Sequence, residues 1–291
     1  MPNKTASRKC RFLSENDLER LHNTFNEAFS DYVLPSELTS TQFRHHLDVN
    51  AVDICRSVGC FDGDEMIGFS LNGFGEWNGR RTVYDAGTGV IPARRRQGVS
   101  NAMFEMMLPV FRKNGIEQFL LEVIASNTAA VRLYEKLGFE KVRELALLRW
   151  DRVQETELSS HERFVIREMD APDWPRFELF WDGKPSWQNM PDALNRVIET
   201  RCVVGAFADE VCVGYVTFSK SLGSVSQLAV DKTRRNLGVA TALLDFAKAK
   251  RKSDRPMQIV NLDKSLGGAM AFFGNRGFSE LVSQFEMIKR L

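Results

Sequence analysis

One block of this sequence occurs twice, and it constrains the fold more than any other feature of the chain. In each copy a valine ends an apolar segment, and a glycine eight residues later opens a segment whose apolar residues have helical spacing. The copies run from Val90 to Gly98 and from Val230 to Gly238, and basic residues fill both loops. A helix that starts after a strand presents unpaired backbone N–H groups, which suit a phosphate. The pattern therefore predicts a phosphate-binding turn in each half and two related domains in tandem.

The spacing downstream of the two turns repeats as well. A Gly-Phe pair follows at 138–139 and again at 277–278, which is 40 residues after the first turn glycine and 39 after the second. Each half therefore has the same order of strands and helices. The predicted fold class is α/β (mixed α+β), with a mixed twisted sheet flanked by helices in each domain. We expect an N-terminal domain over residues 1–152 and a C-terminal domain over residues 161–291, joined by the polar segment Asp151–Glu162.

Local patterns place further elements in front of each turn. The segment Ser14–Asp17 has a capping-box pattern, which predicts the start of the first helix. A hairpin precedes each turn, and its length differs between the two halves. The spacing is 22 residues from Gly68 to Val90 but 16 from Gly214 to Val230. We therefore expect a shorter hairpin in the second domain.

Composition excludes several classes of partner. The 291 residues carry a net charge of +1, which indicates neither nucleic acid nor a membrane surface as a partner. No apolar run is long enough to span a membrane, and the first residues lack the apolar stretch of a signal peptide. The 5 cysteines are odd in number and form no C-x-x-C pair. We therefore expect reduced, buried thiols, no metal site and a cytoplasmic protein.

The turn resembles the pyrophosphate loop of the GNAT superfamily of acyl-CoA-dependent N-acyltransferases, written Arg/Gln-x-x-Gly-x-Gly/Ala. The matching residues are Arg95, Gly98 and Ser100 in the first copy and Arg235, Gly238 and Ala240 in the second. Only the serine departs from the pattern. The resemblance implies acetyl-CoA as co-substrate, bound by Val90, Arg95, Arg96, Gln97, Gly98, Val99 and Ser100. The start of the helix would meet the pyrophosphate, and the arginines would add charge-assisted contacts. An isolated arginine run has a simpler interpretation, as a solvated loop.

A second GNAT signature is similar to residues 121–139. In it an Asn precedes a helix that carries a Tyr and ends in Gly-Phe, and here these residues are Asn127 and Tyr134. The resemblance implies that the Tyr134 hydroxyl protonates the leaving thiolate of coenzyme A and that Asn127 helps to hold the pantetheine arm. Asn127 also fits a simple helix N-cap, and Tyr134 also fits a core aromatic residue.

The second domain departs from this signature. With the two Gly-Phe pairs aligned, Phe273 stands at the position of Tyr134 and Leu266 at that of Asn127. A positioned acid contributes about 10²–10⁴ in rate. We therefore expect the first domain to be catalytic and the second to be degenerate. The second domain can still bind a nucleotide at its turn, or it only shapes the acceptor cleft.

Acyl transfer to an amine needs the neutral amine. For a lysine side chain with a pKa of about 10.4 the neutral form costs about 4 kcal/mol near neutral pH, and for an α-amine under about 1 kcal/mol. Glu122 is the first candidate for the base, because it resembles a Glu of some GNAT protein-N-terminal acetyltransferases; alternatively it only orients the site. Asp85, on the neighbouring strand, is the second candidate. We expect Phe29–Pro35 to recognise the acceptor.

The combined prediction is an acetyl-CoA-dependent N-acetyltransferase with Tyr134 and Glu122 as catalytic residues and Asn127 as a further cofactor contact. The acceptor is a primary amine of a small molecule or a peptide. A non-catalytic acyl-CoA-binding or regulatory protein is the alternative from another class, and transfer of a longer acyl chain is a third. The identity of the amine and the oligomeric state stay open.

Overall fold

The computed structural model describes residues 8–32, 37–150, 164–252 and 254–291. The chain forms two compact units. Each unit packs helices on a sheet with parallel and antiparallel strands, so the predicted fold class is confirmed. The predicted linker, Asp151–Glu162, lies outside the described residues. None of the helices in the described ranges combines the length and apolar character that crossing a bilayer requires.

The first unit is built around the first turn. Its sheet has the order β1-β2-β3-β4-β5, and the end of β12 (Ser279–Arg290) lies beside β5. Its strands are β1 (Lys9–Phe12), β2 (Val58–Asp62), β3 (Glu65–Trp77), β4 (Arg80–Val90) and β5 (Gln118–Ile124). Its helices are α1 (Leu18–Ala28), α2 (Ser40–Val49), α3 (Val99–Lys113) and α4 (Thr128–Lys136).

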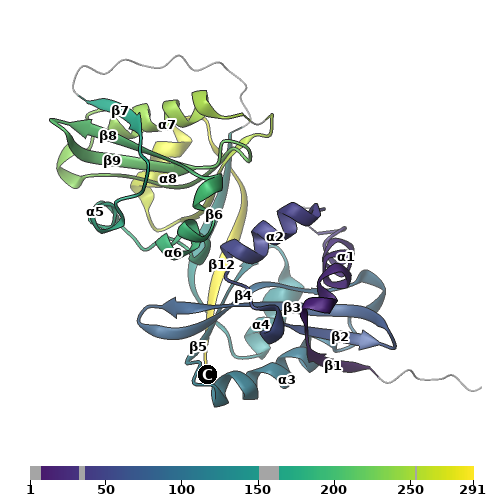
Figure 1. Ribbon diagram of the computed structural model, residues 1–291. Helices are drawn as coiled ribbons and strands as arrows, with labels where there is room; N and C mark the ends of the chain where they lie inside the picture. The colour runs from purple at the N-terminus through teal and green to yellow at the C-terminus, as the bar shows by residue number, and fades with distance from the viewer. Residues whose placement is uncertain (1–7, 33–36, 151–163, 253) are drawn as a thin grey trace, which may run out of the picture. The chain divides into compact units, whose positions relative to one another are not determined.

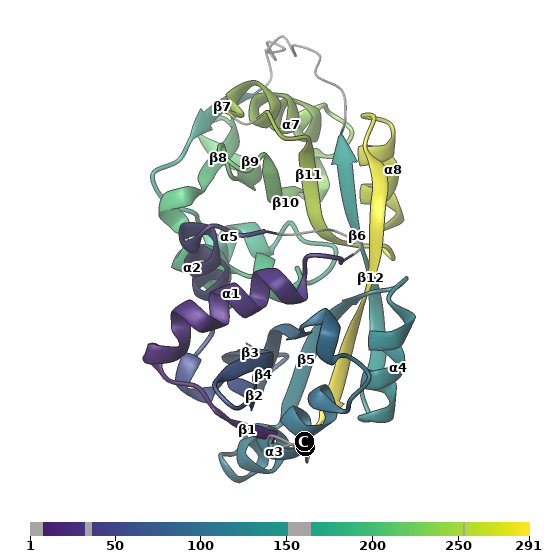
Figure 2. The ribbon, with the colours of Figure 1, turned by 90° about the vertical axis from the view of Figure 1, so that its right-hand side faces the viewer.

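Helices cover both faces of this sheet (Figures 1 and 2). On the face of α1 and α2, Phe25 packs against Phe43 and against Phe69 of β3. On the face of α3 and α4, the rings of Phe104 and Phe119 lie 5.7 Å apart. Burial of large aromatic side chains on both faces supplies much of the apolar contact that holds the unit together.

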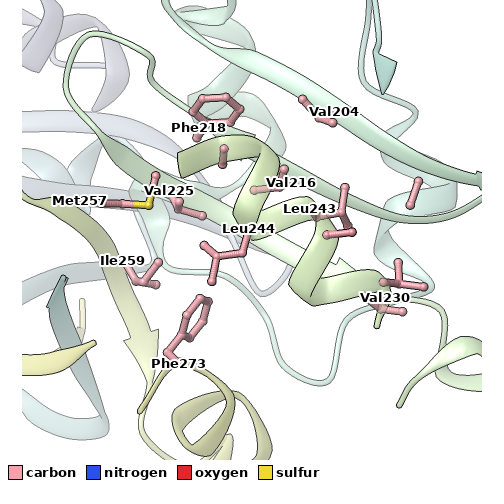
Figure 3. Packing of buried hydrophobic residues seen from close by; sticks show 14 of the residues in the cluster. Val204, Val216, Phe218, Val225, Val230, Leu243, Leu244, Met257, Ile259 and Phe273 are labelled. Carbon is pink, nitrogen blue, oxygen red and sulfur yellow. The ribbon is translucent and has the colours of Figure 1, made fainter. Parts of the chain in front are cut away.

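The second unit repeats the plan with its own helices and strands. Its sheet has the order β6-β11-β10-β9-β8-β7. These strands are β6 (Glu140–Trp150), β7 (Val165–Glu168), β8 (Cys202–Ala208), β9 (Val211–Phe218), β10 (Ser224–Val230) and β11 (Met257–Asp263). Its helices are α5 (Trp174–Glu178), α6 (Pro191–Arg196), α7 (Val239–Lys250) and α8 (Gly267–Gly274). Figure 3 shows its core, where Leu243 and Leu244 of α7 pack with Val216, Ile259 and Phe273.

The two hairpins in front of the turns differ in length. In the first unit Gly68 of β3 lies opposite Val90 of β4. In the second unit Gly214 of β9 lies opposite Val230 of β10. Since the same pair of positions closes a longer hairpin in the first unit, the shorter hairpin predicted for the second domain is confirmed.

The two units exchange their last strands. β6 follows α4 in sequence, but its residues Arg143–Trp150 belong to the second unit, where they pair with β11. The end of β12 belongs in turn to the first unit, where Leu291 donates its backbone N–H to the Glu117 carbonyl at 2.9 Å. The units thus differ from the contiguous ranges 1–152 and 161–291. The reason is that strand pairing depends on contacts between residues distant in sequence.

The cysteines differ from the prediction. Cys10 of β1 and Cys60 of β2 lie opposite each other and form a disulfide, so these two are not reduced thiols. Directly opposed residues of antiparallel strands bring their Cβ atoms close together. Cys202 and Cys212 are buried free thiols, as expected, whereas Cys55 is free and exposed. Burial raises the pKa of the Cys202 thiol to about 11.

Candidate active site

The parallel strands next to each turn separate at a defined point. They are β4 and β5 in the first unit and β10 and β11 in the second. The parallel pairing of β4 with β5 ends at Asp85 opposite Leu121. In the second unit the parallel pairing of β10 with β11 ends at Val225 opposite Ile259. Beyond these pairs the strands no longer bond each other. Ligands of α/β sheets commonly bind at the carboxyl ends of parallel strands, where such a gap lies.

The predicted phosphate turn has the same backbone in both units. Arg96 (φ 60°) and Gly98 (φ 75°) are left-handed residues that lead from β4 into α3. Asn236 (φ 62°) and Gly238 (φ 88°) occupy the same places between β10 and α7. Glycine suits the second position, because a side chain in this conformation costs about 1–2 kcal/mol. Each helix then starts with backbone N–H groups that have no intrahelical partner.

A second glycine lies under each turn. A Cβ on Gly68 would come within 2.9 Å of the side chain of Val99, the first residue of α3. A Cβ on Gly214 would come within 2.9 Å of Val239, the first residue of α7. The missing side chain lets the start of each helix lie against the neighbouring strand. Both turns are therefore held in the same position relative to their sheets.

Arg95 ties the first turn to the end of α1. Its Nε donates to the Val90 carbonyl at 3.1 Å, and its terminal nitrogens donate to the two carboxylate oxygens of Asp31 at 2.7 Å each. One terminal nitrogen also donates to the Ala28 carbonyl at 2.9 Å. The hydrogen bond from Arg95 lowers the pKa of Asp31. These bonds are all internal, so the structure places this predicted cofactor contact in a supporting position.

Arg235 contacts the corresponding groups in the second unit, with one terminal nitrogen on Asp182. It donates to the Val230 carbonyl at 3.2 Å and the Phe180 carbonyl at 3.1 Å, and it pairs with Asp182 at 2.9 Å. We call this arrangement the arginine clamp. Because both units have it, the clamp belongs to the architecture of the turn rather than to the chemistry of one site.

The other arginines of the first turn have different surroundings. Arg94 forms ion pairs with Asp62 at 2.8 Å and with Glu65 at 3.4 Å, at the β2–β3 hairpin. Arg96 is exposed, and no hydrogen bond or ion pair engages it within the described ranges. Of the three arginines, Arg96 is thus the one whose guanidinium is open to a ligand. The backbone carbonyl of Gln97 accepts a hydrogen bond from Arg8.

Tyr134 and Asp85 meet inside the first unit. The Tyr134 hydroxyl donates to Oδ2 of Asp85 at 3.3 Å, and the Thr88 hydroxyl donates to the same oxygen at 2.8 Å. The backbone N–H of Gly87 donates to Oδ1 at 2.9 Å. Burial raises the pKa of Asp85 to about 6, and the hydrogen bonds oppose this rise. Burial, and then the charge of Asp85, raise the pKa of Tyr134 well above its usual value. A neutral phenol therefore lies beside a carboxyl whose pKa is well above that of an exposed aspartate.

Glu122 lies on the other face of the sheet. Its carboxylate accepts a hydrogen bond from the hydroxyl of Tyr84, which is buried in β4. Tyr84 and Asp85 are consecutive strand residues, so their side chains point to opposite faces. The structure therefore brings the two predicted catalytic residues to the same end of the β4–β5 pairing but to opposite faces. Tyr134 lies on the face of α3 and α4, and Glu122 lies on the face of α1 and α2.

Asn127 occupies the predicted cap position. Its side-chain oxygen accepts the backbone N–H of Ala130 at 3.2 Å, at the start of α4. Burial raises the pKa of Tyr32, and a hydrogen bond with Asn127 opposes that rise. Tyr32 belongs to the predicted acceptor segment, of which residues 33–35 lie outside the described residues. Asn127 thus serves as the cap and contacts the predicted acceptor segment.

The corresponding place in the second unit holds a cavity of about 740 Å³. It is lined by the separated ends of β10 and β11, by the second turn and by the start of α8. Four of its lining residues are Val225, Val260, Leu266 and Phe273, at the positions of Asp85, Glu122, Asn127 and Tyr134. None of these four replacements can ionise. No group of three or more His, Cys, Asp or Glu residues in the described ranges of either unit could hold a metal ion.

Three contacts described above were not predicted: the bond between Tyr134 and Asp85, the bond between Tyr84 and Glu122, and the arginine clamp. For the bonds of Tyr84 and Asp85, the available signal was that two neighbouring polar residues stand within a buried strand. Side chains of neighbouring strand residues point to opposite faces of the sheet, so each of the two needs a polar partner on its own face. For the clamp, the signal was an acidic residue shortly after the first α-helix of each half, Asp31 and Asp182.

The fold and the turns define a protein with two α/β units of one architecture, each with the same turn between a strand and a helix. Comparison with known protein families identifies this class of protein. The profile of the Acetyltransferase (GNAT) family matches residues 18–139, and that of the Acetyltransferase (GNAT) domain matches residues 184–288. The chain belongs to the GNAT acetyltransferase family, and the predicted tandem form is confirmed.

Named relatives match over a short segment. Ribosomal protein bS18-alanine N-acetyltransferase of Escherichia coli (strain K12) is 44% identical over 52 residues, which are 18% of this chain and 35% of that protein. Mycothiol acetyltransferase of Thermobispora bispora is 45% identical over 53 residues, which are 18% of this chain and 18% of that protein. The matches thus span about a third or less of the relatives' own length.

Solved structures are similar over the whole chain. The tandem GNAT protein from the clavulanic acid biosynthesis pathway has a TM-score of 0.75 at 16% identity, with 98% of this chain and 98% of that chain covered. The GCN5-related N-acetyltransferase from Sphaerobacter thermophilus has a TM-score of 0.72 at 18% identity, with 100% of this chain and 96% of that one covered. At these identities the likeness shows the fold, in which two units of this kind occur in one chain.

Proposed function

We propose that the protein transfers an acetyl group from acetyl-CoA directly to a primary amine, in the first unit. The observation that carries this proposal is the buried contact between Tyr134 and Asp85, at the end of the β4–β5 pairing and next to the first turn. The second unit has the turn but a phenylalanine and a valine in place of this pair. The names of both relatives support acetyl as the transferred group.

In this proposal the first turn holds the pyrophosphate of acetyl-CoA. The N–H groups at the start of α3 meet the anion at the positive end of the helix dipole. The exposed guanidinium of Arg96 adds a charge-assisted contact, while Arg95 keeps the turn in place through the clamp. The proposed cofactor contacts are Val90, Arg96, Gln97, Gly98, Val99, Ser100 and Asn127, and Arg95, which the sequence predicted as a contact, supports them from the clamp.

The chemistry is assigned to two residues on opposite faces of the sheet. Glu122, held by Tyr84, takes a proton from the amine, directly or through water. Tyr134 gives its proton to the sulfur as the bond between carbon and sulfur breaks. The raised pKa of Tyr134 keeps the phenol protonated at neutral pH, so that its proton is available to the departing sulfur.

The second unit is non-catalytic in this proposal, since its four replacements cannot exchange a proton. The acceptor is an amine of a small molecule or a peptide. The free thiols of Cys55, Cys202 and Cys212 support a cytoplasmic location, whereas the disulfide between Cys10 and Cys60 does not.

The test is a thiol-release assay on the full chain with acetyl-CoA and a panel of amines that includes peptide α-amines, lysine side chains and amino sugars. Release that depends on one class of amine supports the proposal and identifies the acceptor. Calorimetric binding of acetyl-CoA without release on any amine would favour a non-catalytic acyl-CoA-binding protein. Longer acyl-CoAs in the same assay test the acyl chain.

A further inference from the structure

Arg8 brings a further cationic side chain to the first turn from a distant part of the chain. Its guanidinium donates to the backbone carbonyl of Gln97, the residue before the glycine at the start of α3. A Cβ on Gly98 would lie 4.0 Å from the same guanidinium nitrogen. Arg8 is exposed, and within the described ranges its side chain has no other hydrogen bond or ion pair. The rest of the guanidinium is therefore open to a ligand at the start of α3.

An open guanidinium at this place suits a phosphate group. The start of α3 has unpaired backbone N–H groups and the positive end of the helix dipole. A guanidinium matches phosphate oxygens with two parallel hydrogen bonds. Arg94 and Arg95 are already paired with carboxylates of the chain. Among the residues that the structure describes, Arg8 and Arg96 are the arginines next to the turn that have no carboxylate partner.

The position of Arg8 depends on the front end of β1. The rear end of the strand is anchored by an ion pair of 2.7 Å between Arg11 and Asp17. At the front end, two residues after Arg8, the disulfide joins Cys10 to Cys60 of β2. β1 has 4 residues and lies at the edge of the sheet, with β2 as its neighbour. The disulfide is therefore the covalent link that keeps Arg8 at the turn.

The disulfide lies on the face of the sheet that α3 covers. Phe61 belongs to the cluster with Leu21 and Phe25 of α1, so its neighbour Cys60 points to the opposite face. β1 itself lies beside α3 (Figures 1 and 2). Cys60 is fully buried, whereas Cys10 is partly exposed at the edge of the sheet. A thiolate can therefore reach the disulfide from the side of Cys10, and access is one of the conditions for exchange.

We propose that Arg8 binds a phosphate group of acetyl-CoA and that the disulfide between Cys10 and Cys60 makes this contact redox-sensitive; this inference rests on the proposed acetyltransferase function. A dithiol reduces the disulfide. The bond between the two sulfur atoms breaks, it takes up two electrons and two protons to give two thiols, and the dithiol becomes a disulfide. The front end of β1 is then held by backbone pairing alone.

Reduction weakens the binding of acetyl-CoA through the ordering of Arg8. A side chain that is already in place when the ligand arrives loses less conformational entropy than one that has to be ordered. The oxidised chain has Arg8 in place, and the reduced chain does not. In a compartment that keeps thiols reduced, as the exposed free thiol of Cys55 indicates, a disulfide is usually transient and redox-sensing.

Calorimetric binding of acetyl-CoA to the full oxidised chain, without an amine, tests the phosphate contact. Arg8→Ala should raise Kd by about 3- to 10-fold and make it less dependent on salt. Lys9→Ala is the matched control, because it removes the same charge from the neighbour of Cys10, which points away from the face of α3. It should leave Kd unchanged. Equal Kd values for wild type and Arg8→Ala would overturn the contact.

The same measurement with dithiothreitol tests the role of the disulfide. Reduction should raise the wild-type Kd by about 2- to 5-fold and leave that of Arg8→Ala nearly unchanged, because the contact is already absent there. The double variant Cys10→Ala/Cys60→Ala should have the Kd of the reduced chain with or without dithiothreitol. A wild-type Kd that ignores dithiothreitol, or an equal loss in Arg8→Ala, would overturn the redox control. Loss of secondary structure on reduction, followed by circular dichroism, would overturn it as well.

These outcomes can be told apart from those of the proposed function. Binding that responds to Arg8→Ala and to reduction, in a chain that acetylates no amine, supports this inference and contradicts the proposed reaction. Acetyl transfer with the same KM for acetyl-CoA in wild type and Arg8→Ala retains the reaction and overturns this inference. An oxidised chain that does not bind acetyl-CoA would overturn both.

Discussion

The guanidinium of Arg95 meets the carboxylate of Asp31 in two hydrogen bonds of 2.7 Å, and this contact fixes the first turn to the end of α1. The planar fork of an arginine matches the geometry of a carboxylate and leaves its Nε free for a further bond. Arg235 and Asp182 repeat the contact in the second unit. What both units share therefore marks the requirements of the fold, and what they do not share, such as Tyr134, marks the proposed chemistry.

Substitutions of Arg95 and Arg96 should have different effects. In Arg95→Lys the single ammonium cannot replace the bidentate pair and the backbone bonds together. We expect a lower melting temperature and weaker acetyl-CoA binding. Arg96→Ala removes an exposed charge, so the melting temperature should stay constant while Kd for acetyl-CoA rises about 2- to 5-fold. Thermal unfolding and calorimetry measure both. The same loss of melting temperature in both variants would contradict the clamp.

Tyr134→Phe should lower kcat by about 10²–10⁴, with little change in KM for acetyl-CoA, because only the proton donor is lost. Phe273→Tyr is the matched control, since it makes the reverse change at the equivalent position of the second unit. It should leave kcat unchanged. Steady-state thiol release measures both variants, and equal rates for wild type and Tyr134→Phe would remove Tyr134 from the mechanism.

The effect of Glu122→Gln should depend on the acceptor. A lysine-type amine needs about 4 kcal/mol to become neutral near neutral pH, and an α-amine under about 1 kcal/mol. The variant should therefore lose more activity on the lysine-type amine. Tyr84→Phe, which keeps the carboxylate but removes its hydrogen bond, should cause a smaller loss on both. Thiol release with the two amines side by side decides the point, and an equal loss on both acceptors argues for an orienting role.

The two roles of Asn127 can be separated. Serine is a good N-cap residue, so Asn127→Ser should keep the stability of the fold, whereas Asn127→Ala should cost about 1 kcal/mol. Both variants lose the side-chain amide. If that amide holds the pantetheine arm, the KM for acetyl-CoA rises in both, by a similar factor. A raised KM in Asn127→Ala alone would reduce the residue to a cap.

Asp85 should make the stability of the fold depend on pH. Its pKa is about 6 in the fold, against 3.8 for an exposed aspartate. The folded chain therefore binds this proton more tightly than the unfolded chain, and stability falls as the pH rises from about 4 to 6. Above that window the full penalty, about 3 kcal/mol, is present. Asp85→Asn should raise the free energy of unfolding by up to this amount at a pH of about 7.5 and leave it unchanged at about 4. Urea unfolding at the two pH values provides the comparison.

Local features of the site could be predicted from the sequence. Gly98 and Gly238 have the positive φ angles that a turn between a strand and a helix requires. The capping box of Ser14 and Asp17 also forms at its predicted place. These features depend on a few neighbouring residues, so they can be recognised from the sequence alone.

The remaining features depend on partners distant in sequence. Asp31 precedes Arg95 by 64 residues, and Tyr84 precedes Glu122 by 38. An arginine in a basic loop has the same sequence pattern whether it meets a phosphate or a carboxylate of its own chain. The partner is decided only when the helix and the turn pack together, and for this reason the supporting role of Arg95 could not be predicted.

The exchanged last strands restrict how such a protein can evolve. Glu286–Leu291 complete the sheet of the first unit, while Arg143–Trp150 belong to the second. A gene cut between its halves would encode one product with an open edge at β5, which invites aggregation, and another without β6. Once the two copies of a duplicated domain have exchanged strands, each copy needs the other to complete its sheet. Neither copy can then be deleted. The second half, which we propose to be non-catalytic, would then be preserved by selection for folding, and its pocket would be free to acquire mutations that the first half does not tolerate.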